Sequence, residues 1–196
     1  MLQHLRTLDE RLFLFLNGMH NGFFDVIMYW ISNPFTWIPL YILLFFVLYC
    51  RYGKFTWYVL GCVGMMIAAS DQLSSNLVKN WVRRPRPSHV LRLVGRVHLS
   101  KAGPGGDYGF VSSHAANVSA LTLFLVLILP REYNPLKYLL TGWAVLVSYS
   151  RIYNGVHYPG DVAGGALLGL LVVLIFRWLF RRFVGYVMIR NEGHRT

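Results

Sequence analysis

Long apolar runs separated by short polar stretches make up most of the chain. A helix needs about 20 predominantly apolar residues to cross the hydrocarbon core of a membrane, and five runs come close to this length. They are residues 34–50, 55–78, 111–129, 135–153 and 161–180, each bounded by charge, proline or glycine. The pattern predicts an all-α fold, a polytopic bundle of membrane-spanning helices.

The segment from residue 12 to residue 33 breaks this pattern. Its apolar residues are interrupted by Asn17, Gly18, His20, Asn21, Gly22 and Asp25. The segment could be one broken span, or an interfacial helix over roughly residues 8–16 followed by a short span from Phe23. We expect six transmembrane helices in total, with an interfacial helix at the N-terminus.

One connection is long and polar. Residues 81–110 hold three prolines, the sequence Gly-Pro-Gly-Gly at 103–106, and the cations Arg83, Arg84, Arg86, Arg92, Arg96 and Lys101. Loops of this length without structure of their own are usually functional or disordered. General attraction to lipid headgroups, worth about 1 kcal/mol per charge, is an alternative role for all of these cations except Arg86.

The composition agrees with a membrane protein. Of the 196 residues, 55% are hydrophobic and 14% are charged, against about a quarter charged in soluble domains. The length suits a single domain over residues 1–196. The net charge of +11 predicts anionic partners. Because the basic residues lie between spans, membrane lipids and a phosphorylated substrate fit better than nucleic acid.

The positions of the cations also predict an orientation. Two spans separate the long loop from Arg151 and His157, so these segments share one side of the membrane. With Arg6 and Arg11, the opposite side would carry 11 basic residues against eight. The positive-inside rule then places both termini in the cytoplasm and the loop on the exterior or periplasmic side of a bacterial inner membrane.

Three groups of reactive residues fall at this same end of the predicted spans. They are Lys79 with Arg86-Pro87, then Ser112-Ser113-His114, and then Ser150-Arg151 with His157 and Asp161. Lysine and arginine supply fixed charge and N–H donors for an oxyanion. Ser112 and Ser113 open a helix, where free backbone N–H groups and the helix dipole favour an anion.

The two histidines and the carboxylate complete a phosphoryl-transfer site. Asp161 follows His157 by four residues, so it can hold one ring nitrogen protonated and leave the other free to attack. His114 can donate a proton to the leaving oxygen. The sequence lacks the carboxylate cluster that would hold magnesium.

These three groups resemble the signature of the type 2 phosphatidic acid phosphatase family, K-x6-R-P, P-S-G-H and S-R-x5-H-x3-D, which vanadium haloperoxidases share. The resemblance implies a phosphohistidine on His157 oriented by Asp161, with His114 as acid and then base. It also implies phosphate binding by Lys79, Arg86, Ser112, Ser113 and Arg151, with no metal. We expect no cofactor and infer no obligate protein partner. The catalytic region would cover about residues 71–165.

The chain departs from this signature in its second motif. Val111 replaces the proline, and Ser113 replaces the glycine whose backbone N–H approaches the phosphate. This departure concerns substrate choice more than chemistry. Asp71 lies in an apolar span, where an acid is costly, and a structural hydrogen-bond role is favoured over catalysis. Gly160, Gly164, Gly165 and Gly169 predict close helix packing within the fold.

The leading hypothesis is therefore a metal-independent lipid phosphatase of the cell envelope. Candidate substrates are undecaprenyl diphosphate, phosphatidylglycerol phosphate, phosphatidic acid and the phosphates of lipid A, with undecaprenyl diphosphate slightly favoured. One alternative is a phosphotransferase that passes phosphate to another lipid, and another is a non-catalytic lipid-binding protein on the same fold.

Overall fold

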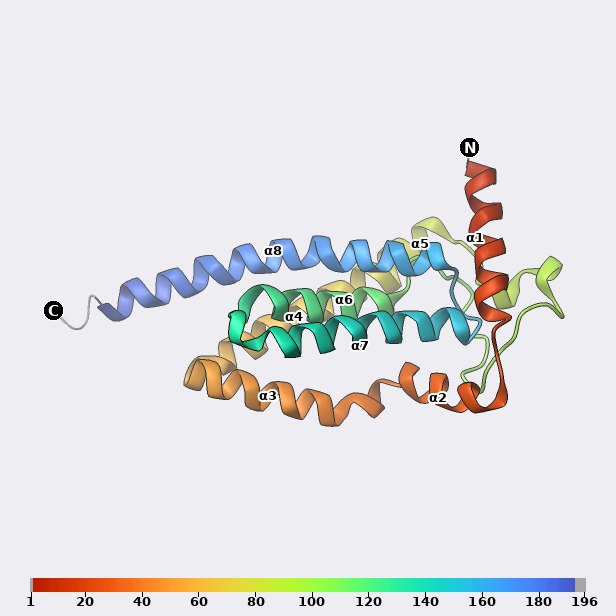
Figure 1. The fold of residues 1–196 in the computed structure, drawn as a ribbon. Helices are drawn as coiled ribbons and strands as arrows, with labels where there is room; N and C mark the ends of the chain where they lie inside the picture. The colour runs from red at the N-terminus through yellow and green to blue at the C-terminus, as the bar shows by residue number, and fades with distance from the viewer. Residues whose placement is uncertain (1, 193–196) are drawn as a thin grey trace.

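The computed structural model describes residues 2–192, with the side chains of residues 3–182, as an elongated bundle of helices (Figure 1). The N-terminal part holds α1 (Leu2–Asn17), α2 (Gly22–Ser32), α3 (Ile38–Tyr52) and α4 (Thr56–Gln72). A π-helical segment (Leu73–Val78) then leads into α5 (Lys79–Val82). The remaining helices are α6 (Ser113–Ile128), α7 (Asn134–Tyr153) and α8 (Pro159–Glu192). The expected all-α fold is confirmed.

Two helical stretches are long and apolar enough to cross a membrane by length and composition. They are Pro34–Val82 and Pro159–Arg182, and Gly22–Ser32 and Ser113–Ile128 are shorter apolar helices. The first stretch reverses its direction at Gly53, so that α3 and α4 run back along each other (Figure 1). Gly53 has a φ of +53°, a conformation that glycine adopts without steric cost.

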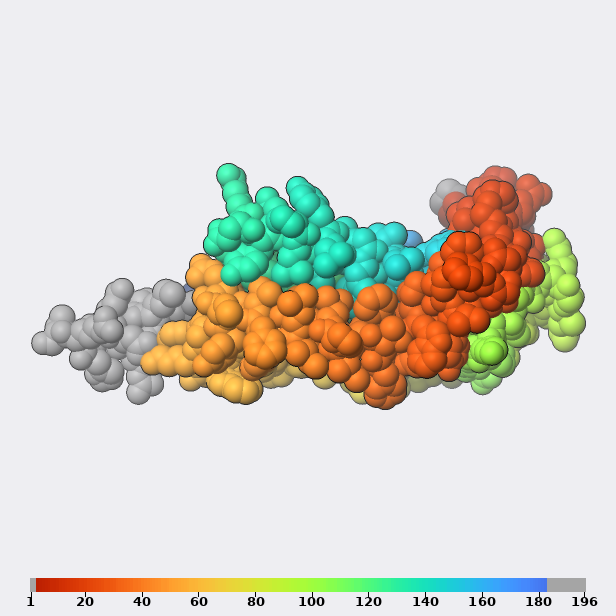
Figure 2. Space-filling model, turned by 60° about the horizontal axis from the view of Figure 1, so that its bottom comes forward, coloured from red at the N-terminus to blue at the C-terminus, as the bar shows by residue number. Residues whose placement is uncertain are grey.

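Helices α2 and α3 form a single pass, which differs from the expected six spans. Successive residues of this pass contact α7 from its end toward its start. Met28 contacts Asn154, which directly follows α7, Ser32 contacts Arg151, and Trp37, between α2 and α3, contacts Trp143. The two helices follow one another along the same face (Figure 2). With 11 residues, α2 is only about 16 Å long. The described residues therefore make five passes along the bundle, and the break at Asn33–Pro34 is an interruption within a pass.

Helix α1 lies across one end of the bundle, steeply inclined to the other helices (Figure 1). Phe13 is fully buried there, and Asn17 donates a hydrogen bond to the Tyr153 carbonyl (2.8 Å). An exposed apolar stripe runs along the helix through Leu5, Leu8, Leu12 and Phe15, and Met19, just after the helix, is exposed as well. Such a stripe suits the interface of a membrane, as predicted for this segment.

The position of α1 changes the expected topology. Its residues contact the end at which α8 begins, whereas α8 runs from there toward the opposite end (Figure 1). With five passes, α1 and the last described turns of α8 lie at opposite ends of the bundle, not at one end as expected (Figure 1). Arg6 and Arg11 therefore join the side of the long loop, and the expected excess of basic residues on the other side is lost. Arg195, which contributed to that excess, lies outside the described residues.

The core brings the beginnings of α6 and α8 into close contact. A Cβ atom on Gly165 would stand 2.4 Å from the carbonyl oxygen of Ser112, and one on Gly169 would stand 2.5 Å from that of Ala116. Only glycine permits this approach of backbone to backbone. The predicted packing role of these glycines is confirmed, and it places Ser113 and His114 beside the segment that carries His157.

Candidate active site

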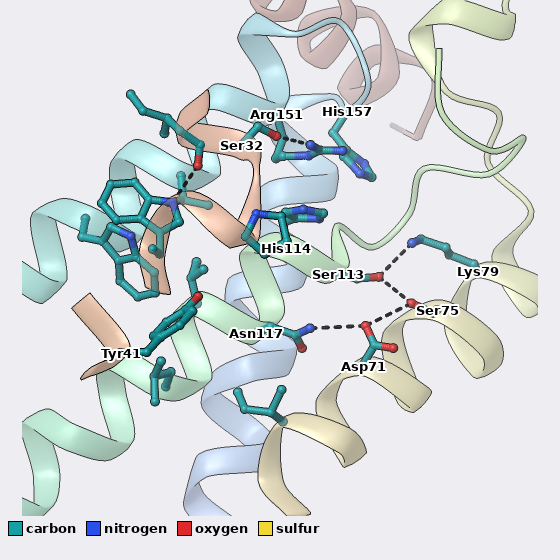
Figure 3. Close-up of a pocket in the computed structure, with 18 of the residues that line it drawn as sticks. Ser32, Tyr41, Asp71, Ser75, Lys79, Ser113, His114, Asn117, Arg151 and His157 are labelled. Atoms are coloured by element: carbon teal, nitrogen blue, oxygen red, sulfur yellow. Dashed lines mark hydrogen bonds between the residues drawn. The ribbon is translucent and has the colours of Figure 1, made fainter. Parts of the chain in front are cut away.

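A cavity of about 600 Å³ opens between α2, α3, α4, α6 and α7 (Figure 3). Its polar end is lined by six of the eight predicted site residues, namely Lys79, Arg86, Ser113, His114, Arg151 and His157. Its other walls are largely apolar and include Trp37, Tyr41, Ile67, Leu121 and Trp143. The structure thus joins residues from four distant segments around one space, with an apolar extension below the charged end.

His157 lies in the turn between α7 and α8, with only 1% of its surface exposed. Its Nδ1 is 3.5 Å from Oδ2 of Asp161, which is fully buried in the first turn of α8. The Tyr158 backbone N–H also donates to this oxygen (2.9 Å). Asp161 therefore stands behind the imidazole and leaves Nε2 as the ring nitrogen available to the cavity.

The electrostatic surroundings keep this imidazole neutral. Burial, together with the charges of Arg86, Arg151 and Lys79, holds the pKa of His157 well below the ordinary value of 6.5. A neutral imidazole is the form that can act as a nucleophile.

The long loop supplies Arg86 and folds tightly against the site. Arg86 is buried, and its Nε donates to the Tyr108 carbonyl oxygen (3.1 Å) while its backbone N–H donates to that of Asp107 (3.1 Å). A Cβ atom on Gly109 would stand 2.7 Å from Oδ2 of Asp161. The loop is thus a built part of the site.

Arg151 and Lys79 approach from opposite walls (Figure 3). Arg151 donates from Nη1 to the Ser32 hydroxyl, and its buried Nε has no hydrogen-bond partner among the described side chains and backbone. Lys79 Nζ donates to Oγ of Ser113 (2.8 Å). Both cations keep donors that an oxyanion could accept.

The start of α6 adds backbone donors. Ser112 caps the helix: its Oγ accepts from the Ala115 N–H (3.4 Å), and its own N–H donates to the Asp161 carbonyl oxygen (2.9 Å). Within the described residues, the N–H groups of Ser113 and His114 have no partner. The hydroxyl of Ser112 therefore serves the helix rather than lining the cavity, whereas Ser113 and His114 present their N–H groups at a helix start.

Asp71 heads a hydrogen-bonded group on the cavity wall that the motifs did not include. Its Oδ1 accepts from Asn117 (3.2 Å) and from Ser75 (3.4 Å). The Ser75 and Ser113 hydroxyls are 2.8 Å apart, which extends the group to Lys79 (Figure 3). The structural role favoured for Asp71 is supported. Its spacing of four residues from Ser75 was a usable signal, but nothing in the sequence indicated Asn117.

Arg84 was also missed, since it was grouped with the headgroup-attracting cations of the loop. Its Nη1 donates to Asp161 Oδ1 (2.9 Å), and its Nη2 donates to Asp9 Oδ2 (2.7 Å). A residue that bonds the carboxylate behind His157 belongs to the structure of the site. The sequence offered no signal for this contact, because Asp9 lies 75 positions away.

A neutral buried imidazole backed by a carboxylate, a second histidine and three converging cations is the arrangement of a phosphoryl-transfer site. The helical bundle places it at the end of apolar helices, where a lipid headgroup would lie. The fold and the site therefore define a membrane-bound enzyme of phosphoryl transfer.

Comparison with known proteins agrees. The sequence model of the PAP2 superfamily matches residues 57–184. A lipid A 4'-phosphatase of Bacteroides thetaiotaomicron is 33% identical over 174 residues, covering 86% of this chain and 75% of that protein. One of Porphyromonas gingivalis is 36% identical over 174 residues, covering 87% and 72%. The crystal structure of Aquifex aeolicus LpxE has a TM-score of 0.66 and 27% identity, over 86% of this chain and 94% of that one.

The chain therefore belongs to the PAP2 superfamily. It is a membrane enzyme, a phosphatase that acts on a phosphorylated lipid.

Proposed function

We propose that this chain hydrolyses a phosphate monoester of a lipid A type glycolipid through a phosphohistidine on His157. The observation that carries the choice of substrate is the similarity, at 33% and 36% identity over most of the chain, to two proteins named as lipid A 4'-phosphatases. This similarity replaces undecaprenyl diphosphate, which the sequence alone slightly favoured, as the leading candidate.

The layout of the cavity supports this choice. Between the cations at its charged end and the apolar walls lies a polar layer of Asp71, Ser75 and Asn117. A sugar phosphate has hydroxyl groups between its phosphate and its acyl chains, and such groups can hydrogen-bond to a polar layer. A prenyl diphosphate has its apolar chain directly on the phosphate and would place that chain against these polar side chains, which already bond to one another and gain no partner from it.

In the first step, Nε2 of His157 attacks phosphorus while Asp161 holds the proton on Nδ1. The bond between phosphorus and the lipid oxygen breaks, and His114 donates a proton to that oxygen. The lipid leaves as an alcohol and the phosphate stays on His157. Lys79, Arg86 and Arg151, with the N–H groups at the start of α6, would bind the phosphate oxygens.

In the second step, His114 accepts a proton from a water molecule, which attacks phosphorus as the bond to His157 breaks. Inorganic phosphate leaves, and His157 and His114 return to their starting protonation states. Ser112 contributes by capping α6 and bonding the Asp161 carbonyl, so its part is to hold the two segments in register.

The substrate can be tested on purified protein in detergent. Lipid A, undecaprenyl diphosphate, phosphatidylglycerol phosphate and phosphatidic acid are assayed side by side for free phosphate, and mass spectrometry locates the phosphate lost from lipid A. The proposal expects the highest kcat/KM on lipid A. A tenfold preference for any other substrate would overturn the substrate assignment, and phosphate found on a second lipid would favour the phosphotransferase.

The same assay tests independence from metal. Full activity is expected with a chelator present, because the cations that bind phosphate are side chains. Activity that is lost with the chelator and restored by a divalent ion would contradict this mechanism.

We also place the site on the exterior or periplasmic side of the inner membrane. The support is the basic residues that remain once Lys79, Arg86 and Arg151 are assigned to the phosphate: within residues 2–192 the end far from the site then carries eight, including Arg177, Arg181 and Arg182, against seven at the site end. Cys50 is exposed at the end opposite to the site, whereas Cys62 is buried. In intact cells an impermeant maleimide should therefore label a Cys50→Ala/Ala102→Cys protein, and should label the native protein only after lysis. The reverse pattern would invert the orientation.

A further inference from the structure

Asp9 of α1 and Arg84 of the long loop form a closed set of bonds behind the site. Arg84 bridges two carboxylates, with Nη1 on Asp161 and Nη2 on Asp9 (2.9 and 2.7 Å). The second oxygen of Asp9 accepts from the Gly160 backbone N–H (2.7 Å), next to Asp161 in the sequence. Three segments that are distant in the sequence thus meet at one carboxylate pair.

We propose that Asp9 and Arg84 are positioning residues that set the rotation of the Asp161 carboxylate toward His157. This inference rests on the proposed role of His157 as the nucleophile.

The geometry shows how this would work. Asp161 has two oxygens with different partners: Oδ1 is bound by Arg84, and Oδ2 accepts from the Tyr158 N–H and faces Nδ1 of His157. The distance of 3.5 Å to Nδ1 is longer than a full hydrogen bond. A small movement of the Asp161 carboxylate would shorten this distance to that of a hydrogen bond when substrate binds. Arg84, by holding Oδ1, keeps Oδ2 turned toward Nδ1 so that this movement is possible.

Asp9 in turn fixes Arg84. Its side chain holds the second arm of the guanidinium and also bonds the first turn of α8. The guanidinium lies over the Tyr158 ring, 4.0 Å from its centre, which further restricts its plane. A Cβ atom on Gly160 would stand 2.7 Å from Oδ2 of Asp9, so glycine is required for this approach. Helix α1 thereby acts on the nucleophile through two side chains.

The neighbouring pair on α1 provides a matched control. Glu10 accepts from Arg92 of the same loop (2.6 Å), so this pair also ties α1 to the loop. Arg92 is 71% exposed, whereas Arg84 is 20% exposed, and neither Glu10 nor Arg92 bonds a site residue. If both pairs, Asp9–Arg84 and Glu10–Arg92, only anchored α1 to the loop, their loss would change kcat equally. If Asp9 and Arg84 orient Asp161, only their loss should slow turnover.

The test is a pair of double-mutant cycles, Asp9→Ala with Arg84→Ala and Glu10→Ala with Arg92→Ala. We measure kcat, KM, the inhibition constant of inorganic phosphate and the melting temperature. Each single change at Asp9 or Arg84 is expected to lower kcat about tenfold or more, since misplacement of a catalytic group by about 1 Å costs about 100-fold. The inhibition constant should stay within about twofold, because the cage of cations is untouched. The double variant should be no slower than the worse single variant, because both residues act through one carboxylate.

The control cycle should leave kcat within about twofold. Three results would overturn the proposal. One is that the losses of kcat at Asp9 and Arg84 add up in the double variant, and another is that the Glu10–Arg92 cycle loses as much kcat. The third is that phosphate binding weakens as much as kcat falls. Should Arg84→Ala fail to fold, Asp9→Asn decides alone: it keeps the shape of the side chain but not its charge, and an unchanged kcat would overturn the proposal. A His157→Ala protein measured in parallel separates the two claims, since full turnover there would overturn the nucleophile itself.

Discussion

Replacement of Gly109 by alanine tests how closely the long loop must approach the catalytic carboxylate. A Cβ atom at this position would lie 2.7 Å from Oδ2 of Asp161, whereas ordinary contacts begin at 3.4 Å. The carboxylate or the loop must therefore move by about 0.7 Å. The backbone hydrogen bond from the Gly109 N–H to the Arg84 carbonyl oxygen is unaffected, so the added methyl group is the only direct change.

The displaced oxygen is the one that faces His157, so the loss should appear in turnover. A shift of about 1 Å in a catalytic group costs about 100-fold, and we expect kcat to fall by about 10- to 100-fold. The KM should change by less than about threefold, because the cations around the phosphate keep their places. Release of free phosphate in detergent, followed over a range of substrate concentrations, gives both constants.

Gly106→Ala is the matched control in the same loop. A Cβ atom on Gly106 meets nothing within 4 Å, and its φ lies outside the left-handed region. This variant should keep wild-type kcat. The reasoning is refuted if Gly109→Ala retains kcat within about twofold, or if Gly106→Ala loses as much.

Three further predictions follow from the site and its supports. Arg86→Gln removes a positive charge that lowers the pKa of His157, so that pKa should rise. The acidic limb of the pH profile of kcat/KM should then move to higher pH. A limb that stays in place or moves to lower pH would contradict the prediction. Ser113→Gly removes the hydrogen-bond partner of Lys79. The KM should rise about five- to tenfold, in line with the roughly 1 kcal/mol of a hydrogen bond, and kcat should stay nearly unchanged. An unchanged KM would show that Lys79 does not need this hydrogen bond. Gly165→Ala places a Cβ atom 2.4 Å from the Ser112 carbonyl oxygen and should lower the melting temperature by several degrees. At Gly142 a Cβ atom meets nothing within 4 Å, so Gly142→Ala should leave the melting temperature unchanged or raise it. Equal effects of the two variants would argue against close packing of α6 and α8.

The gathering of the proposed catalytic residues at one place was predictable, because their spacing along the chain decides which end of the bundle each of them reaches. A separation of four residues, from the turn before α8 into its first turn, suffices to put Asp161 behind His157, and the ends of the predicted spans suffice to bring Lys79, His114 and Arg151 to one side. The structure adds how these groups are held. The contact of Arg84 with Asp9 joins a loop to an N-terminal helix, and no local pattern of polar and apolar residues encodes such a pairing.

The number of passes shows a different limit of sequence analysis. An apolar run interrupted by polar residues can turn back or continue, and the residues Asn33 and Pro34 are compatible with both. Only the order of the contacts along α7 shows that α2 and α3 continue in one direction. Ser112 is a similar case, because a serine before a helix can cap the helix or bind a ligand, and the sequence does not tell that its Oγ accepts from the Ala115 N–H (3.4 Å).

The central claim is that phosphate passes through His157, and trapping the phosphoenzyme tests it most directly. A His114→Ala protein lacks the group that activates water, so phosphate from a radiolabelled lipid substrate should stay on the protein. The account predicts label that is stable to base and labile to acid, as expected for a phosphoramidate, and located by mass spectrometry on the peptide that contains His157. Label on any other residue, or a His157→Ala protein that still releases phosphate at the wild-type rate, would contradict it.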